Sequence, residues 1–347
     1  MRENSYTFSF KLFLKFIIFA VVVLLLFGMA GKKYKTAAEK NTVNAFTEQR
    51  FDEFYKQPEN SIDMVFIGSS HSYCTFDPEI IDAYLGTNSW QMGTPSQHAD
   101  TSYYVLREIF NYQKPKTVVM ELYWDCLDDE FELKQAESVF EVMDNKELVD
   151  EYINKVFPAG DKVKYALPAI RYQQDYFAYA GTLMQNEIEE KYGVSRSRQE
   201  ASGGSEYYRS KGYVYCDMVM ASDEYDRTNQ FKYFDGYGWE IDPTQKEYLE
   251  KIIELCSQNG ARLVFVTAPV APVSMEFIEN YEYVHSAISG FAEKNGIPYL
   301  DFNTVNKTEN LFENANFRDD AHLNHSGVQI ADRYFSKWIR TSAGFEQ

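Results

Sequence analysis

Residues Ile62–Ser72 read IDMVFIGSSHS, a short apolar run that ends at Gly68 in a serine-rich turn. Such a run is typical of a buried strand, and glycine lets the chain turn sharply where the strand ends. Three further apolar runs have the same character: Thr117–Leu122, Ala261–Thr267 and Ile297–Asp301. Helical patterns occupy other parts of the chain: Asp100–Tyr112, Pro243–Asn259, Phe277–Asn295 and Ser326–Ile339. This alternation predicts a three-layer α/β/α fold, with a mostly parallel sheet covered on both faces.

The turn after the first apolar run holds a candidate nucleophile. Ligand sites of parallel sheets lie beyond the carboxyl ends of the strands, which is where Ser70 is expected. Gly68 permits a tight turn that would expose its hydroxyl. Ser69 and Ser72 are neighbours that could take the same role. In the alternative interpretation, the serines of this turn only cap the following helix.

A second segment, Phe317–Asn324, reads FRDDAHLN and places an aspartate three residues before a histidine. A serine nucleophile needs a base, and the base needs a partner that fixes its tautomer. We therefore predict a triad of Ser70, His322 as the base and Asp319 as its partner. Asp320 is the alternative partner. In a purely structural interpretation, both aspartates complement the dipole of the next helix.

A metal site is a further alternative for the same residues. Its ligands would come from Asp319, Asp320, His322 and His325, joined by His71 or His98. These residues follow no recognised ligand spacing, so we predict neither a metal nor another cofactor. In the triad hypothesis, His325 lies near a helix start as a capping or supporting group.

The order of the two motifs resembles the SGNH (GDSL-like) hydrolase superfamily. The resemblance rests on Gly68–Ser72 early in the chain and on Asp319, His322 and Gly327 late in it. It is closest to a membrane-anchored bacterial branch that includes DltD, a teichoic-acid D-alanylation protein, and alginate-acetylation proteins. It implies a flavodoxin-like fold, with Ser70 as nucleophile and Asp319 and His322 completing the triad. The family's aspartate before the serine is replaced here by Ser69.

The resemblance also implies an oxyanion hole, and here the sequence departs from the family. The family's second block carries a glycine and its third an asparagine, whereas the third block here, Glu121–Asp125, has no asparagine. The Ser70 N–H is one candidate donor, and Gly93, the Ser96 backbone and the Gln97 side chain are the others. Losing one such donor typically lowers the rate by about 10²–10³-fold. Tyr123 and Trp124 are expected to be core or rim aromatics.

The N-terminus predicts a membrane anchor. Residues 12–31 are apolar apart from Lys15, which can snorkel, and about 20 such residues cross a bilayer core of about 30 Å. A cleaved signal peptide or a buried helix would be the alternatives. Lysines flank both ends, so the positive-inside rule leaves the orientation open.

These signals divide the 347 residues into six segments. We expect a tail at 1–11, the anchor at 12–31, a juxtamembrane stalk at 32–60 and two parts of the α/β domain at 61–125 and 238–347. Residues 126–237 form an acidic, Tyr-rich insertion that is expected to be mostly helical, with an exposed loop at Ala201–Ser205.

The amino-acid composition bears on nucleic-acid binding and on disulfide formation. A formal charge of −18 argues against nucleic-acid binding, and the four cysteines are scattered and leave the question of a disulfide open: Cys74, Cys126, Cys216 and Cys256. The candidate triad and the N-terminal anchor predict a membrane-anchored esterase or O-acyltransferase, and the resemblance implies a cell-surface glycopolymer as its substrate. The resemblance implies an extracytoplasmic domain and a multi-pass membrane acyltransferase as partner. The alternative is a catalytically inactive scaffold of the same fold.

Overall fold

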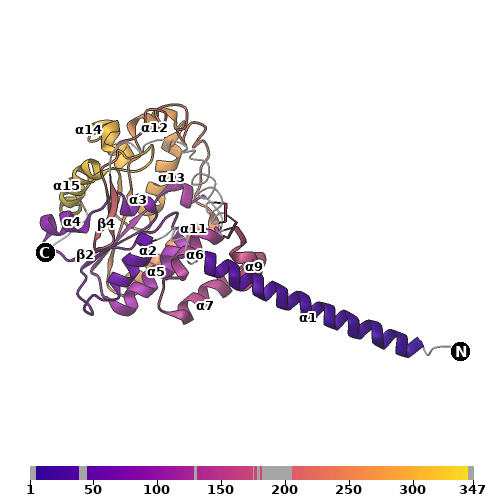
Figure 1. The fold of residues 1–347 in the computed structure, drawn as a ribbon. Helices are drawn as coiled ribbons and strands as arrows, with labels where there is room; N and C mark the ends of the chain where they lie inside the picture. The colour runs from indigo at the N-terminus through magenta and orange to yellow at the C-terminus, as the bar shows by residue number, and fades with distance from the viewer. Residues whose placement is uncertain are drawn as a thin grey trace. The chain divides into compact units, whose positions relative to one another are not determined.

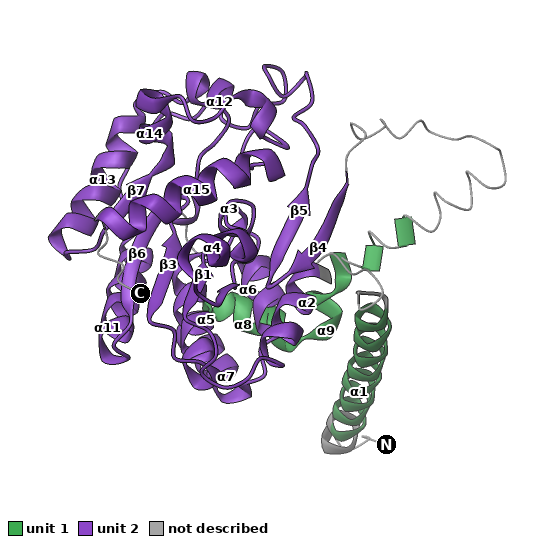
Figure 2. Cartoon of the chain, turned by 90° about the vertical axis from the view of Figure 1, so that its left-hand side faces the viewer, with its two compact units in different colours: residues 1–43, 157–198 green, residues 44–156, 199–347 purple. Residues whose placement is uncertain are grey.

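The computed structural model describes residues 5–38, 45–128, 131–174, 176–177, 180–181 and 205–342. They fall into two compact units, shown in green and purple in Figure 2. The smaller unit comprises residues 1–43 and 157–198, and the larger one comprises residues 44–156 and 199–347.

The smaller unit is dominated by one long helix, α1 (Ser5–Ala38), which Figure 1 shows as a continuous rod. Within it, the 27 residues Phe10–Thr36 are long enough to cross a membrane and contain an 18-residue window with a mean hydropathy of 2.8. The predicted span at 12–31 lies inside this stretch. Two short helices, α8 (Ala159–Ala166) and α9 (Pro168–Arg171), belong to the same unit, and α9 approaches α1 closely at Gly31.

The larger unit is built on a five-stranded sheet with the order β2-β1-β3-β6-β7, in which every pair of neighbours is parallel. The strands are β1 (Met64–Ile67), β2 (Ser89–Gln91), β3 (Thr117–Glu121), β6 (Arg262–Thr267) and β7 (Tyr299–Asp301). The predicted parallel α/β sheet is confirmed. Our sequence analysis missed β2, because three residues are too few to show a periodic pattern.

Helices cover both faces of this sheet. They are α3 (Ser70–Tyr73), α4 (Pro78–Leu85), α5 (Ala99–Tyr112), α11 (Pro243–Gln258), α12 (Pro272–Phe277), α13 (Tyr281–Lys294), α14 (Phe302–Glu309) and α15 (His325–Ser342), with two 3₁₀ turns at Trp124–Cys126 and Asn314–Asn316. The helices α4 and α15 pack on one face and contribute to a single core with β1, β3, β6 and β7. On the opposite face, α5 contacts β1, and Phe291 of α13 packs on Phe265 of β6.

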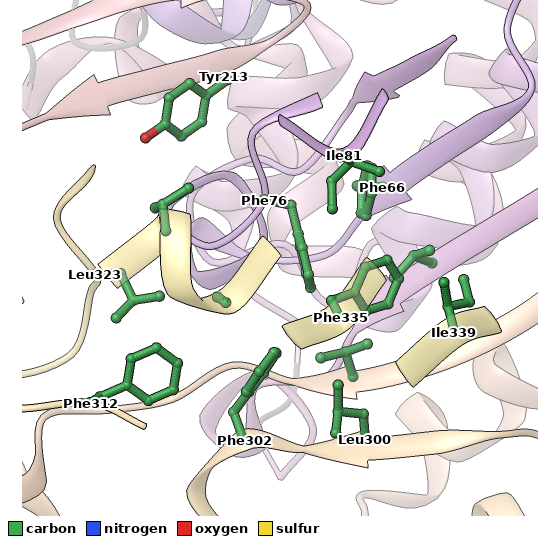
Figure 3. Packing of buried hydrophobic residues seen from close by; sticks show 14 of the residues in the cluster. Phe66, Phe76, Ile81, Tyr213, Leu300, Phe302, Phe312, Leu323, Phe335 and Ile339 are labelled. Atoms are coloured by element: carbon green, nitrogen blue, oxygen red, sulfur yellow. The ribbon is translucent and has the colours of Figure 1, made fainter. Parts of the chain in front are cut away.

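Figure 3 shows the aromatic centre of this core. Phe66 of β1 stacks on Phe76 with ring centroids 4.8 Å apart, and Phe335 of α15 meets Phe76 edge-on at 5.1 Å. Leu300 and Phe302, at the end of β7, extend the cluster. Burying such large side chains is the main force that holds α15 on the sheet.

The region predicted as a mostly helical insertion contains a β-hairpin as well as helices. Its first part contains α6 (Leu133–Phe140) and α7 (Lys146–Lys155). Its last part is an antiparallel hairpin of β4 (Glu206–Ser210) and β5 (Tyr213–Cys216). Lys211 and Gly212 both have positive φ, the geometry of a two-residue hairpin turn. Of the predicted exposed loop, residues 201–204 lie outside the described residues.

The region predicted as a juxtamembrane stalk is divided between the two units. Residues 32–38 continue α1, whereas α2 (Ala45–Phe54) belongs to the larger unit and buries Phe51 and Phe54. The buried guanidinium of Arg50 donates a hydrogen bond to the carbonyl of Gly212 in the hairpin. These contacts pack one face of α2 against other elements of the larger unit. The helix is therefore part of the folded domain and not of a stalk. All four cysteines are buried, and no two of them form a disulfide bond.

Candidate active site

The serine-rich turn separates its serines by function. Ser69 caps α3, since its Oγ accepts the backbone N–H of His71 at 3.2 Å. Ser72 is buried, and its Oγ donates to Gln91 at 3.1 Å. Only Ser70 directs its hydroxyl to a histidine, with Oγ 2.8 Å from Nε2 of His322. The capping role expected in the alternative interpretation is thus present in Ser69, beside a different role for Ser70.

His322 and Asp319 lie on the loop before α15 and extend this contact into a chain of three side chains. The Nδ1 of His322 is 2.9 Å from Oδ1 and 3.1 Å from Oδ2 of Asp319. A proton on Nδ1 satisfies the carboxylate and leaves Nε2 to accept the Ser70 hydroxyl. The structure therefore brings together Ser70, His322 and Asp319, although 252 residues separate the serine from the histidine.

Asp319 is set up to stay ionised. Its Oδ1 also accepts the backbone N–H groups of Ala321 at 2.9 Å and His322 at 2.7 Å. The Nε of Arg318 lies 3.5 Å from its Oδ2. Burial on its own would raise the pKa of Asp319, but the charge of His322 and these hydrogen bonds outweigh burial and lower that pKa below its usual value.

The other proposed partners and metal ligands have different contacts. Asp320 accepts two hydrogen bonds from Gln230, at 2.6 Å from its backbone and 2.5 Å from its side chain. His325 begins α15 and its Nδ1 lies 3.0 Å from the hydroxyl of Tyr213. His98 is buried at the start of α5. Among the described residues, no group of three or more His, Cys, Asp or Glu side chains is arranged to hold a metal ion.

Two of the expected oxyanion donors are engaged elsewhere. The N–H of Gly93 donates to Oε1 of Gln91 at 2.8 Å. The amide of buried Gln97 donates to Ser102 and accepts from Thr94, both at 2.9 Å. These groups are already satisfied inside the protein, which the sequence could not show.

The other two expected oxyanion donors are backbone N–H groups. The backbone N–H groups of Ser70 and Ser96 have no hydrogen-bond partner among the described residues. Ser96 has a φ of +48°, an uncommon conformation for a residue other than glycine.

The sequence model of a family described as "Protein of unknown function (DUF1574)" matches residues 9–326. The chain belongs to the DUF1574 family. No curated protein matches it.

Several solved structures are similar to this DUF1574 protein. A putative acylhydrolase from Bacteroides fragilis NCTC 9343 is 12% identical, with a TM-score of 0.40 over 85% of this chain and 96% of that one. A GDSL-like lipase from Bacteroides thetaiotaomicron VPI-5482 is 12% identical, with a TM-score of 0.37 over 86% and 99%. An acetylxylan esterase from Geobacillus stearothermophilus is 12% identical, with a TM-score of 0.33 over 83% and 96%. Likeness at this level carries no argument about activity.

Sequence reasoning gave no role to Glu121, which lies beneath the turn. Its Oε2 accepts both the backbone N–H of Ser69 at 3.0 Å and the Ser69 hydroxyl at 2.7 Å. It is buried at the end of β3, and burial raises its pKa to about 7, more than the two Ser69 hydrogen bonds lower it. The signal available in the sequence was an ionisable residue that ends an apolar strand.

His71 is the second residue whose place the sequence did not show. Its ring is 2% exposed and stacks on Tyr123, with centroids 4.0 Å apart and planes 25° apart. The ring of His322 is also close, with its centroid 4.6 Å from that of His71 and the two planes 34° apart. Burial, followed by the nearby charge of His322, lowers the pKa of His71 well below its ordinary value. In this DUF1574 protein, the base is thus flanked by a second, neutral imidazole.

Proposed function

We propose that this DUF1574 protein is a serine acyl-ester hydrolase or O-acyltransferase. The observation that carries the proposal is the continuous set of hydrogen bonds from Ser70 through His322 to Asp319. A half-buried carboxylate, a correctly orientable imidazole and a hydroxyl at 2.8 Å are the parts that nucleophilic acyl transfer needs.

The chemistry follows from the geometry. Ser70 Oγ attacks the acyl carbonyl while His322 Nε2 takes its proton, and Asp319 stabilises the imidazolium that forms. The free backbone N–H of Ser70 is a donor for the oxyanion, with that of Ser96 as a second candidate. His322 then returns the proton to the leaving alcohol. Water or an acceptor hydroxyl releases the acyl group from the serine in a second round.

The place of the reaction is proposed on weaker grounds. An N-terminal helix that is long and apolar enough to span a bilayer supports a single-pass anchor. The resemblance to the anchored SGNH branch supports an extracytoplasmic domain, a glycopolymer substrate, acetyl or another small acyl group, and a multi-pass acyltransferase as partner. An anchor would keep the serine near a polymer that is made at the membrane.

A second candidate function is a non-catalytic scaffold of the same fold. It is favoured by the engagement of Gly93 and Gln97 in internal hydrogen bonds, which leaves the oxyanion with fewer donors. The absence of an asparagine in Glu121–Asp125 points the same way. The intact contacts of Ser70 and His322 oppose it.

A fluorophosphonate probe separates the two functions on the full-length chain in detergent micelles. An enzyme is expected to be labelled at Ser70, and mass spectrometry identifies the site. Ser70→Ala and His322→Ala should abolish labelling, whereas Ser72→Ala, the matched control in the same turn, should retain it. No labelling of the unmodified protein would support the scaffold and overturn the enzyme. A series of p-nitrophenyl esters of increasing acyl length then identifies the preferred acyl group.

A further inference from the structure

Four aromatic rings contact one another in succession, from the core of the larger unit to the proposed general base. We call this set, Trp124, Tyr123, His71 and His322, the column. Trp124 is buried and packs on Phe231 and Tyr281, with ring centroids 5.9 Å and 5.4 Å away. Tyr123 lies against Trp124 at 4.9 Å, His71 stacks on Tyr123, and His322 ends the column. The far end of the column is thus anchored in well-packed protein.

The two hydrogen bonds of His322 leave one motion of its ring free. One bond is made at Nδ1 to Asp319 and one at Nε2 to Ser70, and a hydrogen bond to a ring nitrogen is strongest in the plane of the imidazole. The ring can still tilt about the line that joins these two nitrogens, and a tilt misaligns both bonds at once. A flat neighbour on one face of the ring prevents that tilt.

We propose that His71 is a positioning residue, whose ring packs against that of His322 and holds the plane of the catalytic imidazole. This inference rests on the proposed function, because it assigns His71 a role in the same reaction. It gives a role to the ring of His71, the residue after the proposed nucleophile. The ring nitrogens of His71 take part neither in the capping contact of Ser69 nor in the triad.

Stacking explains the observations better than a hydrogen bond from His71. Among the described residues, none forms a hydrogen bond with either ring nitrogen of His71, whereas its ring contacts the rings of both Tyr123 and His322. A neutral ring also suits the position, since a second positive charge 4.6 Å from His322 would oppose its protonation during the reaction. The imidazole that gains the Ser70 proton is therefore His322 and not its neighbour.

Two substitutions separate the role of the ring from that of its nitrogens. His71→Phe keeps a flat ring and removes both nitrogens. His71→Asn keeps a polar hydrogen-bonding group and removes the ring. His71→Leu is the control for volume, and a thermal unfolding curve for each full-length variant shows whether it is folded.

The rate of fluorophosphonate labelling at Ser70 is the first readout. If the ring positions His322, the Phe variant should react within about threefold of the unmodified protein, and the Asn and Leu variants about tenfold or more slowly, because small misplacements of a reacting group are costly. The reverse order, with Asn active and Phe inactive, would show that a nitrogen of His71 acts on the substrate and would overturn the inference. Equal rates in all three variants would overturn it too.

Proton NMR of histidine-labelled protein supplies a readout that does not depend on reactivity. The chain has five histidines, and His322→Gln assigns the ring protons of His322 by their loss. A ring stacked on His322 shifts these protons upfield, so the shift should persist in His71→Phe and vanish in His71→Leu. An unchanged shift in the Leu variant would contradict the stack. A stack that is present in a protein that no fluorophosphonate labels would overturn both the proposed function and the positioning role, whereas labelling without the stack would overturn the positioning role alone.

Discussion

Asp319 performs two tasks with one carboxylate. It orients His322 through Nδ1, and it accepts two backbone N–H groups of its own loop, so the loop and the base share a single support. Asp320, its neighbour, makes its contacts with Gln230 instead. Adjacent acidic residues of the same type thus differ in role because the loop turns their side chains in different directions.

Replacing each aspartate in turn tests this division. Asp319→Asn removes the negative charge beside the imidazole and favours the wrong tautomer, so the rate of Ser70 labelling should fall by about 10²–10⁴-fold. Asp320→Asn is the matched control and should leave that rate within about threefold, since the contact with the base is untouched. Equal losses in the two variants would mean that either substitution acts by disturbing the loop.

Glu121 predicts a pH dependence of stability. Its pKa in the folded protein is raised to about 7 from an ordinary value of 4.5. Below pH 4.5 the group is protonated in both states and contributes nothing. Between pH 4.5 and 7 the unfolded chain ionises first, so the folded protein loses stability as the pH rises, on the order of 3 kcal/mol in total.

Glu121→Gln should remove this loss, because the amide does not titrate and its oxygen can still accept from Ser69. Unfolding of the full-length protein, followed at several pH values between 4 and 8, gives the difference between the two proteins. We expect the free energy of unfolding of the unmodified protein to decrease relative to that of the variant as the pH rises across that window. Parallel curves would show that Glu121 is ionised in the folded protein without penalty.

At the scale of the elements, the decisive feature is how β1 passes into α3. Gly68 has a φ of +133°, and a Cβ placed on it would lie 2.8 Å from both the Cβ and the carbonyl oxygen of Glu121. The turn can hold the nucleophile above Glu121 only because Gly68 has no side chain. An apolar strand followed by glycine and serines made this element predictable from sequence.

Alanine substitutions at two glycines test the turn. Gly68→Ala should destabilise the protein by about 3 kcal/mol or more, since it combines a strained backbone with a steric overlap. Gly290→Ala is the control: it lies in α13, nothing would come within 4 Å of its new Cβ, and it should gain about 0.5–1 kcal/mol. Thermal unfolding measures both changes. A stable Gly68→Ala variant would contradict the assigned turn.

The hairpin is an element that sequence reasoning did not identify within the insertion expected to be mostly helical. Its turn, Lys211-Gly212, lies between two Tyr-rich runs, and both turn residues have positive φ. The hairpin is fixed by ion pairs to other elements, Lys211 with Asp82 at 2.6 Å and Glu206 with Arg318 at 2.5 Å. Because Arg318 precedes Asp319, the hairpin supports the loop that carries the triad.

At the scale of the whole molecule, the N-terminal helix predicts how the protein distributes in cells. Phe10–Thr36 measures about 40 Å at about 1.5 Å per residue, enough for a bilayer core of about 30 Å. Val22→Arg with Leu25→Arg places two charges near its centre, each opposing insertion by about 3 kcal/mol. The variant should appear in the soluble or aggregated fraction after carbonate extraction, whereas the unmodified protein stays with the membrane.

Thr36→Arg is the control for that experiment, because a charge at the end of the span can reach the interface and should not change the fractionation. Release of the unmodified protein by carbonate would contradict a membrane-spanning role for this helix. Retention of the doubly charged variant would do the same.

The sequence by itself determined the parallel α/β sheet, the apolar N-terminal helix and the candidate site residues Ser70, Asp319 and His322. These features depend on local signals: apolar periodicity, a glycine at a strand end, and a fixed spacing of aspartate and histidine. The tertiary structure decided which serine meets His322, that the N–H of Gly93 and the amide of Gln97 are engaged in internal hydrogen bonds, and that the ring of His71 lies against that of His322. Those outcomes depend on which side chains long-range packing brings within 3–5 Å, and no local pattern encodes contacts between residues that lie 252 positions apart.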